Sequence, residues 1–223
     1  MCSSDLNAAS SCNASYSANE LRFDVAGSGC ANTAFGTVVH HEYGHNLVDK
    51  GGSGQGAYGE GMGDVCALLV TDDPVLGAGF WGSCASGLRS AANACRYAPS
   101  LCSDCGSEIH ACGQLLSGCV WSLRDRLRAA DPAGYETTLR RLAVNAVPLH
   151  GPVQTIDADI PLDYLALDDD DGDLRNGTPH FQAIASAFID HGIRVPLVAF
   201  AFPDGIPATA APDGTTTFRV SIS

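Results

Sequence analysis

Two histidines four residues apart, with a glutamate beside the first, form the stretch of this chain best suited to chemistry. They are His41, Glu42 and His45, within the segment HHEYGHNLVD. On a helix, residues i and i+4 lie one turn apart on one face, so both imidazole rings can reach the same metal ion. Glu42 sits about 100° round the helix from His41, beside the metal, where it can take a proton from a metal-bound water. The stretch therefore predicts a hydrolytic metal site on a helix.

The residues around the histidines support this helix. Val38, Val39 and Val48 contribute to an apolar side, and Gly51-Gly52 supplies a stop. Gly44 costs such a helix roughly 1 kcal/mol relative to alanine. We therefore expect position 44 to need the space that a side chain would fill.

A second segment supplies the remaining ligand. Glu60 opens the segment EGMGDVCALLV, and Asp64 follows it by about one helical turn. A catalytic zinc site needs three protein ligands and one open position, and Glu60 can be the third ligand. Asp64 can accept a hydrogen bond from the far ring nitrogen of a zinc-binding histidine. We therefore predict one catalytic Zn²⁺ held by His41, His45 and Glu60.

The spacing also distinguishes between groups of zinc peptidases. The metzincin pattern requires Gly three residues and His six residues after the second histidine, where this chain has Val48 and Gly51. The glutamate-plus-aspartate pattern instead resembles the gluzincins, the thermolysin-like group. Within that group, HEYGH and GEGMGD are most similar to fungalysin and its bacterial relatives. The gap between His45 and Glu60 is short for the group, which implies a trimmed connection.

The resemblance covers residues 7–194 and implies both a fold and an activity. The fold would be α+β and mostly helical, a thermolysin-like zincin catalytic domain with a small edge sheet before the metal helix. The activity would be that of a secreted zinc metalloendopeptidase acting on protein or peptide substrates, with Glu42 as general base. In this group an edge strand holds the substrate by strand addition. Leu21–Val25, or the stretch 32–35, is expected to play that part here.

A later stretch resembles the fungalysin segment in which a histidine opens a long helix beside the zinc. It contains His110, and apolar residues at 109, 116, 120, 123 and 127 approximate one helical face. The resemblance gives His110 the stabilisation of the oxyanion that forms when the peptide carbonyl is attacked. A histidine that opens the helix without catalytic work is the alternative. Either Asp104 or Glu108 could orient its ring.

Composition limits the partners of the chain. The net charge is −13 and Lys50 is the only lysine, which argues against nucleic acid and against anionic membrane surfaces. Ten scattered cysteines predict disulfides and an oxidising, extracellular location. The sequence contains no transmembrane run and no secretory signal. Nothing in it indicates an oligomeric state.

Changes in composition and in expected secondary structure divide the chain into three regions. Residues 1–6 look like the translation of a sequencing-adaptor tail, so we expect a non-native tail on a fragment of a longer secreted protein. Residues 7–194 form the predicted catalytic domain, with further helices expected at Tyr135–Val147, Ile160–Leu167 and Phe181–His191. Residues 195–223 contain strand-like segments separated by Pro, Gly and Asp. They predict the truncated start of an all-β, immunoglobulin- or fibronectin-like module.

The cysteines predict disulfide crosslinks, called staples below, and the glycines predict a loop. Cys12 and Cys30 flank the strand-like Leu21–Val25, so a bridge between them is expected beside the site. The four cysteines at 84, 95, 102 and 105 are expected to staple an irregular segment, 71–106, rather than to bind metal or do redox chemistry. The glycine-rich stretch 50–59 is expected to be a flexible connection over the site.

The acidic run Asp168–Asp173 is a second, weaker candidate for a cation site. An EF-hand is excluded, because Gly172 at position 6 would place Leu167 at position 1 and Thr178 at position 12. An irregular calcium site and a solvated acidic turn both remain open.

Two other functions compete with the endopeptidase. One is a protease-like adhesion or binding domain of a surface protein, which would not need the base Glu42. The other is an aminopeptidase on the same metal site. The chain has no Gly-x-Met-Glu-Asn stretch of the kind that anchors a free amino terminus in that group.

Overall fold

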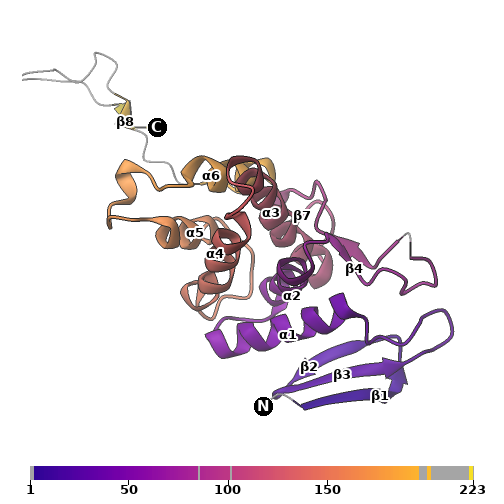
Figure 1. Ribbon diagram of the computed structural model, residues 1–223. Coiled ribbons are helices and arrows are strands. Elements are labelled where there is room, and N and C mark those ends of the chain that lie inside the picture. The colour runs from indigo at the N-terminus through magenta and orange to yellow at the C-terminus, as the bar shows by residue number, and fades with distance from the viewer. Residues whose placement is uncertain (1–2, 85, 101, 196–199, 202–220, 223) are drawn as a thin grey trace, which may run out of the picture.

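The computed structural model describes residues 3–84, 86–100, 102–195, 200–201 and 221–222. A three-stranded sheet precedes a body of helices (Figure 1). The strands are β1 (Ser3–Ser11), β2 (Ala14–Ser17) and β3 (Glu20–Val25), and the helices are α1 (Gly36–Gly51), α2 (Gly56–Thr71), α3 (Ile109–Ala130), α4 (Tyr135–His150), α5 (Ile160–Asp168) and α6 (Phe181–Asp190). Minor elements are β4 (Val75–Leu76), β5 (Arg89–Ser90), β6 (Tyr97–Ala98), β7 (Cys102–Ser103), the 3₁₀ turn Leu174–Asn176, β8 (Phe200–Ala201) and β9 (Ser221–Ile222). The α+β class with small sheets is confirmed.

The sheet packs against α1 through a small apolar core. Its order is β1-β3-β2, with β1 parallel and β2 antiparallel to β3. Ala18 and Asn19 join β2 to β3 with φ values of 48° and 68°, the left-handed backbone of a two-residue hairpin whose turn matches strand twist. Leu21 and Phe23, two residues apart on one face of β3, meet Val38 of α1 in a buried cluster. The sheet is thereby fixed to the helix that carries both histidines.

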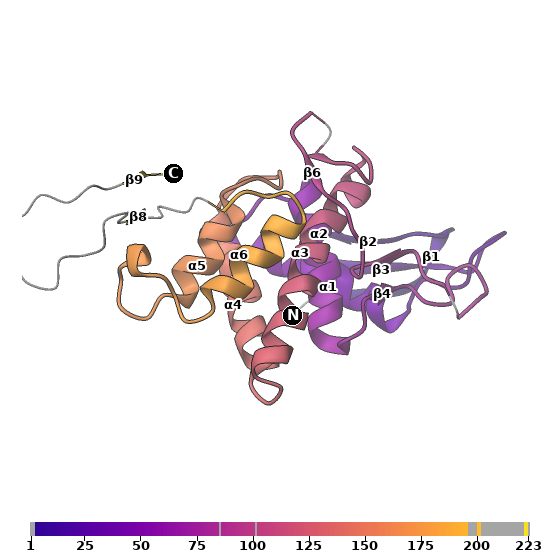
Figure 2. The same ribbon diagram turned by 90° about the horizontal axis from the view of Figure 1, so that it is seen from above.

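Helix α2 is the centre of the helical body. It contacts α1 on one side and α3 on the other, and nearly all of its side chains from Ala57 to Leu69 are buried. Apart from Glu60 and Asp64 the buried stretch is apolar or glycine, and a helix of this composition suits such a central position. Seen from above, α4, α5 and α6 lie on the side away from the three-stranded sheet (Figure 2). The main core runs through all six helices.

Two glycines allow α1 and α2 to approach unusually closely. A Cβ placed on Gly44 would lie 2.7 Å from Cα of Gly63, and a Cβ on Gly63 would lie 2.6 Å from the ring of His41. Real Cβ atoms almost never come this near a neighbour, so neither position accepts a side chain without movement. The expected need for space at Gly44 is thus explained by the backbone of α2.

The cysteine-rich segment before α3 is held by disulfides. Cys12–Cys30 closes the sheet, as predicted, while Cys95–Cys105 and Cys102–Cys112 tie the segment to itself and to the first turns of α3. Cys102 and Cys105 therefore belong to different bridges, as expected for staples. Among the described cysteines, 66, 84 and 119 carry free thiols. The expectation that Cys84 would be a disulfide staple was therefore wrong, because each of the other three expected cysteines is bridged to another residue. The three bridges are compatible with an oxidising, extracellular setting.

None of the described helices is both long and apolar enough to cross a membrane. Residues 3–6 form part of β1, where Ser3 to Leu6 pair with Glu20 to Phe23. In the C-terminal region only the paired backbones of β8 and β9 are described. The tail at residues 1–6 and the β module at residues 195–223 stay predictions, and most of the latter region lies outside the described residues.

The expectation of a flexible connection over residues 50–59 was wrong. Helix α1 continues to Gly51 and ends at Gly52, whose φ of 80° is the left-handed cap, while α2 begins already at Gly56. The connection is therefore only four residues long. Glycine lowers helix propensity, but the packing of α2 between its neighbours offsets that cost.

We predict that Gly63→Ala destabilises the fold by about 1–3 kcal/mol, the usual cost of overpacking, because the new methyl group collides with the ring of His41. The matched control is Gly36→Ala at the exposed start of α1, where a Cβ meets no atom within 4 Å. Its free energy of unfolding should stay within about 0.5 kcal/mol of the parent. Urea unfolding of the three proteins measures both values. Equal stabilities for the two variants would contradict the close contact.

Candidate metal centre

Helices α1 and α2 bring the three predicted ligands together. One ligand atom each of His41, His45 and Glu60 lies within 4.8 Å of the other two. Nε2 of His41 is 3.2 Å from Oε2 of Glu60, and Nε2 of His45 is 3.6 Å from Oε1. His41 and Glu60 are buried and His45 is partly buried. The group has the composition and spacing to hold one metal ion.

The buried Oε2 of Glu60, which faces the histidine ligands, makes no hydrogen bond within the described residues, and Nε2 of His110 is its one further ion-pair neighbour among them. The Nδ1 atoms of His41 and His45 are both engaged elsewhere, which leaves Nε2 of each ring for the shared space. A buried carboxylate oxygen without a partner is costly. A cation is the partner that suits these three atoms together, so the residues fit a metal ion.

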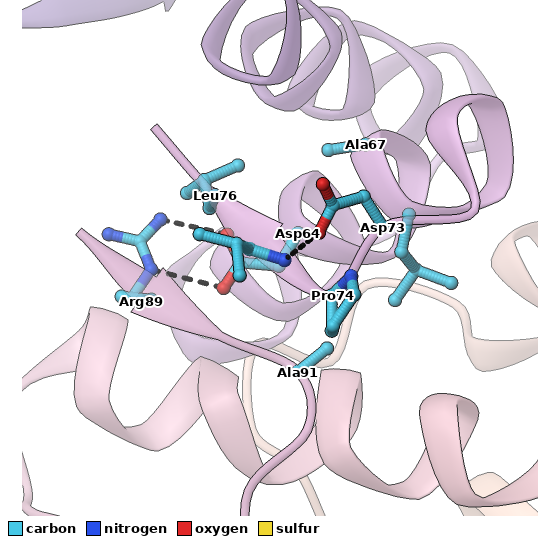
Figure 3. A pocket seen from close by; sticks show the side chains of 9 residues that line it. Asp64, Ala67, Asp73, Pro74, Leu76, Arg89 and Ala91 are labelled. Atoms are coloured by element: carbon cyan, nitrogen blue, oxygen red, sulfur yellow. Dashed lines mark hydrogen bonds and ion pairs between the residues drawn. The ribbon is translucent and has the colours of Figure 1, made fainter. Parts of the chain in front are cut away.

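Asp64 orients His41, as the sequence predicted. Its Oδ1 lies 2.8 Å from Nδ1 of His41. Arg89 of β5 donates two hydrogen bonds to the same carboxylate, from Nε to Oδ2 at 3.0 Å and from Nη2 to Oδ1 at 2.8 Å. Figure 3 shows this guanidinium facing the carboxylate. Arg89 is a residue that sequence reasoning missed, since no motif marks an arginine 25 positions after its partner.

The contacts among Arg89, Asp64 and His41 set the pKa values of these buried side chains. Burial by itself would raise the pKa of Asp64, but Arg89 and His41 lower it to about 2. Burial would likewise lower the pKa of His41, but the carboxylates of Asp64 and Glu60 raise it to about 9. Asp64 is thus held as an anion beside His41. An ionised carboxylate on Nδ1 keeps that nitrogen protonated and turns Nε2 toward the metal position.

Gln55 orients His45 in the same manner. Its Nε2 donates to the backbone carbonyl of His45 at 3.0 Å, and its Oε1 lies 2.8 Å from Nδ1 of that histidine. A backbone carbonyl only accepts, so the amide nitrogen must face it and the amide oxygen must face Nδ1. Nδ1 therefore carries the hydrogen and Nε2 keeps its lone pair. Sequence reasoning missed Gln55, whose only signal was a polar side chain in the short connection after His45.

The predicted base, Glu42, lies beside the ligands. It is buried, with only 6% of its surface exposed, and it lines the same cleft as His41, His45 and Glu60. Burial raises the pKa of Glu42 to about 7, although His41 opposes the rise. The carboxylate thus stands next to the metal position, as its place on the helix predicts.

His110 reaches the group from α3. Its Nε2 lies 3.2 Å from Oε2 of Glu60, and its Nδ1 lies 2.7 Å from Oε1 of Glu108. Glu108 also caps the helix by accepting from the backbone N–H groups of His110 and Ala111 at 3.0 Å and 3.4 Å. Of the two acids considered, Glu108 orients the ring, while Asp104 accepts a hydrogen bond from the backbone of Arg96.

A cleft of ≈ 480 Å³ runs past these residues and along β2. Residues 13–17, which include all of β2, line it. The expectation that Leu21–Val25 or the stretch 32–35 would be the substrate edge was wrong. Strand β3 is paired on both sides, and residues 32–35 form no strand. The edge strand beside the cleft is β2, because β3 lies between β1 and β2 in the sheet.

Only some of the carboxylates in the acidic run are placed where they could bind a cation. Asp168 is buried and already bonded, to Oγ1 of Thr178 at 2.7 Å and to Nδ1 of His180 at 2.6 Å. Asp169, Asp170 and Asp171 each offer an oxygen within 4.8 Å of the others. Asp168 thus ties α5 to the start of α6, and a calcium ion at the remaining three stays a prediction.

We predict that Asp64→Ala weakens the binding of Zn²⁺, the ion the sequence indicates, by about 10–100-fold, because His41 loses the group that orients it. Competition with a chelator measures the affinity. Asp159→Ala, which removes an exposed carboxylate at the start of α5, is the control and should bind Zn²⁺ like the parent. An unchanged affinity in Asp64→Ala would show that the contact with His41 does not serve the metal.

Comparison with known proteins adds no family to this geometry. The chain matches no protein-family model, and no curated protein is significantly similar to it. The metal centre therefore rests on the convergence of His41, His45 and Glu60 in the structure.

Proposed function

We propose that this chain is the catalytic domain of a secreted zinc-dependent endopeptidase of the fungalysin-like, thermolysin-related type. The observation that carries the proposal is the convergence of His41, His45 and Glu60 in a cleft that also contains Glu42. Two histidines and one carboxylate are a frequent ligand set of catalytic zinc, which keeps a fourth position open. The order of the motifs along the chain supports the same group.

The cleft supports an extended peptide as substrate. Strand β2 presents a free edge beside the metal position. Main-chain hydrogen bonds to such an edge bind peptides of many sequences, since every residue offers the same backbone groups. The peptide would thereby be laid across the ligands with one of its carbonyls near Glu42.

The side chains have separate tasks in hydrolysis. A zinc ion held by His41, His45 and Glu60 would acidify a water molecule and polarise the peptide carbonyl. Glu42 would accept the proton of the attacking water and pass it to the leaving amine. In its imidazolium form, with Nδ1–H donating to Glu108, His110 would also donate from Nε2 to the carbonyl oxygen as negative charge develops there. A binding domain without catalysis would need neither Glu42 nor this arrangement of His110.

Glu42→Gln tests the base. The variant should keep its zinc, because the ligands remain, and lose nearly all turnover of peptides, because an amide accepts no proton. Zinc content by elemental analysis and cleavage of a fluorogenic peptide library are the two measurements. Glu136→Gln, at an exposed position of α4, is the control and should cleave like the parent. A parent protein that binds zinc and cleaves nothing would instead favour the adhesion domain.

His110→Ala tests the oxyanion donor. The expected result is a kcat lower by about 10²–10³-fold, with KM little changed, because the contact forms in the transition state. The melting temperature should hold, since Glu108 caps α3 through backbone N–H groups that the substitution leaves in place. Zinc content should hold as well. A loss of zinc would make His110 a fourth ligand, and an unchanged kcat would remove it from catalysis.

A further inference from the structure

The cleft contains a carboxylate that the metal centre does not use. Glu42, Glu60 and Asp49 all line it, and its described lining includes no lysine or arginine. The first two belong to the metal centre. Asp49 lies further along α1, four residues after His45, on the same helical face. The far end of the cleft therefore has a carboxylate that the reaction itself does not explain, and Lys50 pairs with it from outside the lining.

Asp49 is held in place while one of its oxygens stays accessible. The hydroxyl of Tyr16, on β2, donates to Oδ2 at 2.8 Å, and Nζ of Lys50 lies 3.1 Å from the same oxygen. No hydrogen bond to Oδ1 joins these contacts within the described chain, and the side chain is 48% exposed. The hydrogen bonds from Tyr16 and Lys50 lower the pKa of Asp49, so it is ionised at neutral pH.

The position of Asp49 relates it to a particular part of a bound peptide. Four helical residues span about 6 Å along the axis. An extended peptide advances about 3.3 Å per residue. For a peptide that runs along the axis of α1, Asp49 therefore lies about two peptide residues beyond His45, on the side where Tyr16 joins β2 to α1. A side chain of a peptide laid along β2 would meet Oδ1 at that distance.

We propose that Asp49, positioned by Tyr16, forms a subsite for a basic side chain, lysine or arginine, about two residues from the scissile bond. This inference rests on the proposed endopeptidase function and adds its substrate class. An arginine fork matches a carboxylate in two hydrogen bonds, and a lysine makes a single charged contact. The printed contacts of Tyr16 and Lys50 are both with Oδ2, so a substrate cation would approach the half-exposed carboxylate from its Oδ1 side.

Matched peptides test the subsite on a single enzyme preparation. Fluorogenic peptides carry lysine, arginine, glutamine or glutamate at each of three positions on either side of the cleaved bond. At one position, about two residues from that bond, lysine and arginine should raise kcat/KM about threefold to fivefold over glutamine, the size of a half-exposed ion pair. The gain should appear in KM and fade at 1 M salt, where charges are screened. Because it is a ratio within one preparation, it is insensitive to the folded fraction.

Variants assign the preference to Asp49. Asp49→Asn keeps the shape of the side chain and should abolish the preference, and Asp49→Lys should reverse it toward glutamate. Asp159→Asn removes an exposed carboxylate elsewhere and should keep it. If the parent and Asp49→Asn cleave all peptides with equal selectivity, the subsite is overturned and the endopeptidase stands. If no peptide is cleaved, the affinities of the parent and of Asp49→Asn for labelled lysine and glutamine peptides are compared instead. A preference that depends on Asp49 supports the subsite without the protease, and equal binding overturns both.

Discussion

The close contact between the backbones of α1 and α2 is the constraint on which the rest of the structure depends. Gly44 and Gly63 leave no room for a side chain between the two helices. At this separation, His41 and His45 of one helix can share a small volume with Glu60 of the other. A methyl group at either glycine would separate the helices or displace the ring of His41. Two residues with poor helix propensity therefore serve a geometric need, and burial of α2 offsets their cost.

The same contact buries two carboxylates, whose charges neighbouring side chains must compensate. Asp64 and Glu60 are both buried, and an isolated buried carboxylate is costly. Arg89 compensates Asp64 with two hydrogen bonds, and Asp64 in turn orients His41. Oε2 of Glu60 receives no such hydrogen bond. The structure thus fixes the outer carboxylate by hydrogen bonds and leaves the inner one facing imidazole nitrogens, an arrangement that could hold a metal ion.

The elements around this centre bring in groups from distant parts of the chain. The short connection between α1 and α2 contributes Gln55, the hairpin strand β5 contributes Arg89, and the capped start of α3 contributes His110. The disulfides Cys95–Cys105 and Cys102–Cys112 hold the irregular segment between β5 and α3. A segment with little regular structure loses much entropy on folding, and crosslinks reduce that loss. The staples thereby help to hold the approach to α3 near the metal ligands.

The sequence by itself determined the residues whose relation is local. The i, i+4 histidines, the glutamate and aspartate one turn apart, the strand at Leu21–Val25 and the long helix after His110 all follow from short-range periodicity, and the structure contains each of them. Tertiary structure alone decided the partners. Which acid orients His110, which strand borders the cleft and which residues hold Asp64 and His45 depend on how distant segments pack. The glycine-rich stretch shows the physical reason. Its composition favours a loop, but burial between α1 and α3 makes most of it helix, because packing free energy summed over many contacts exceeds local propensity.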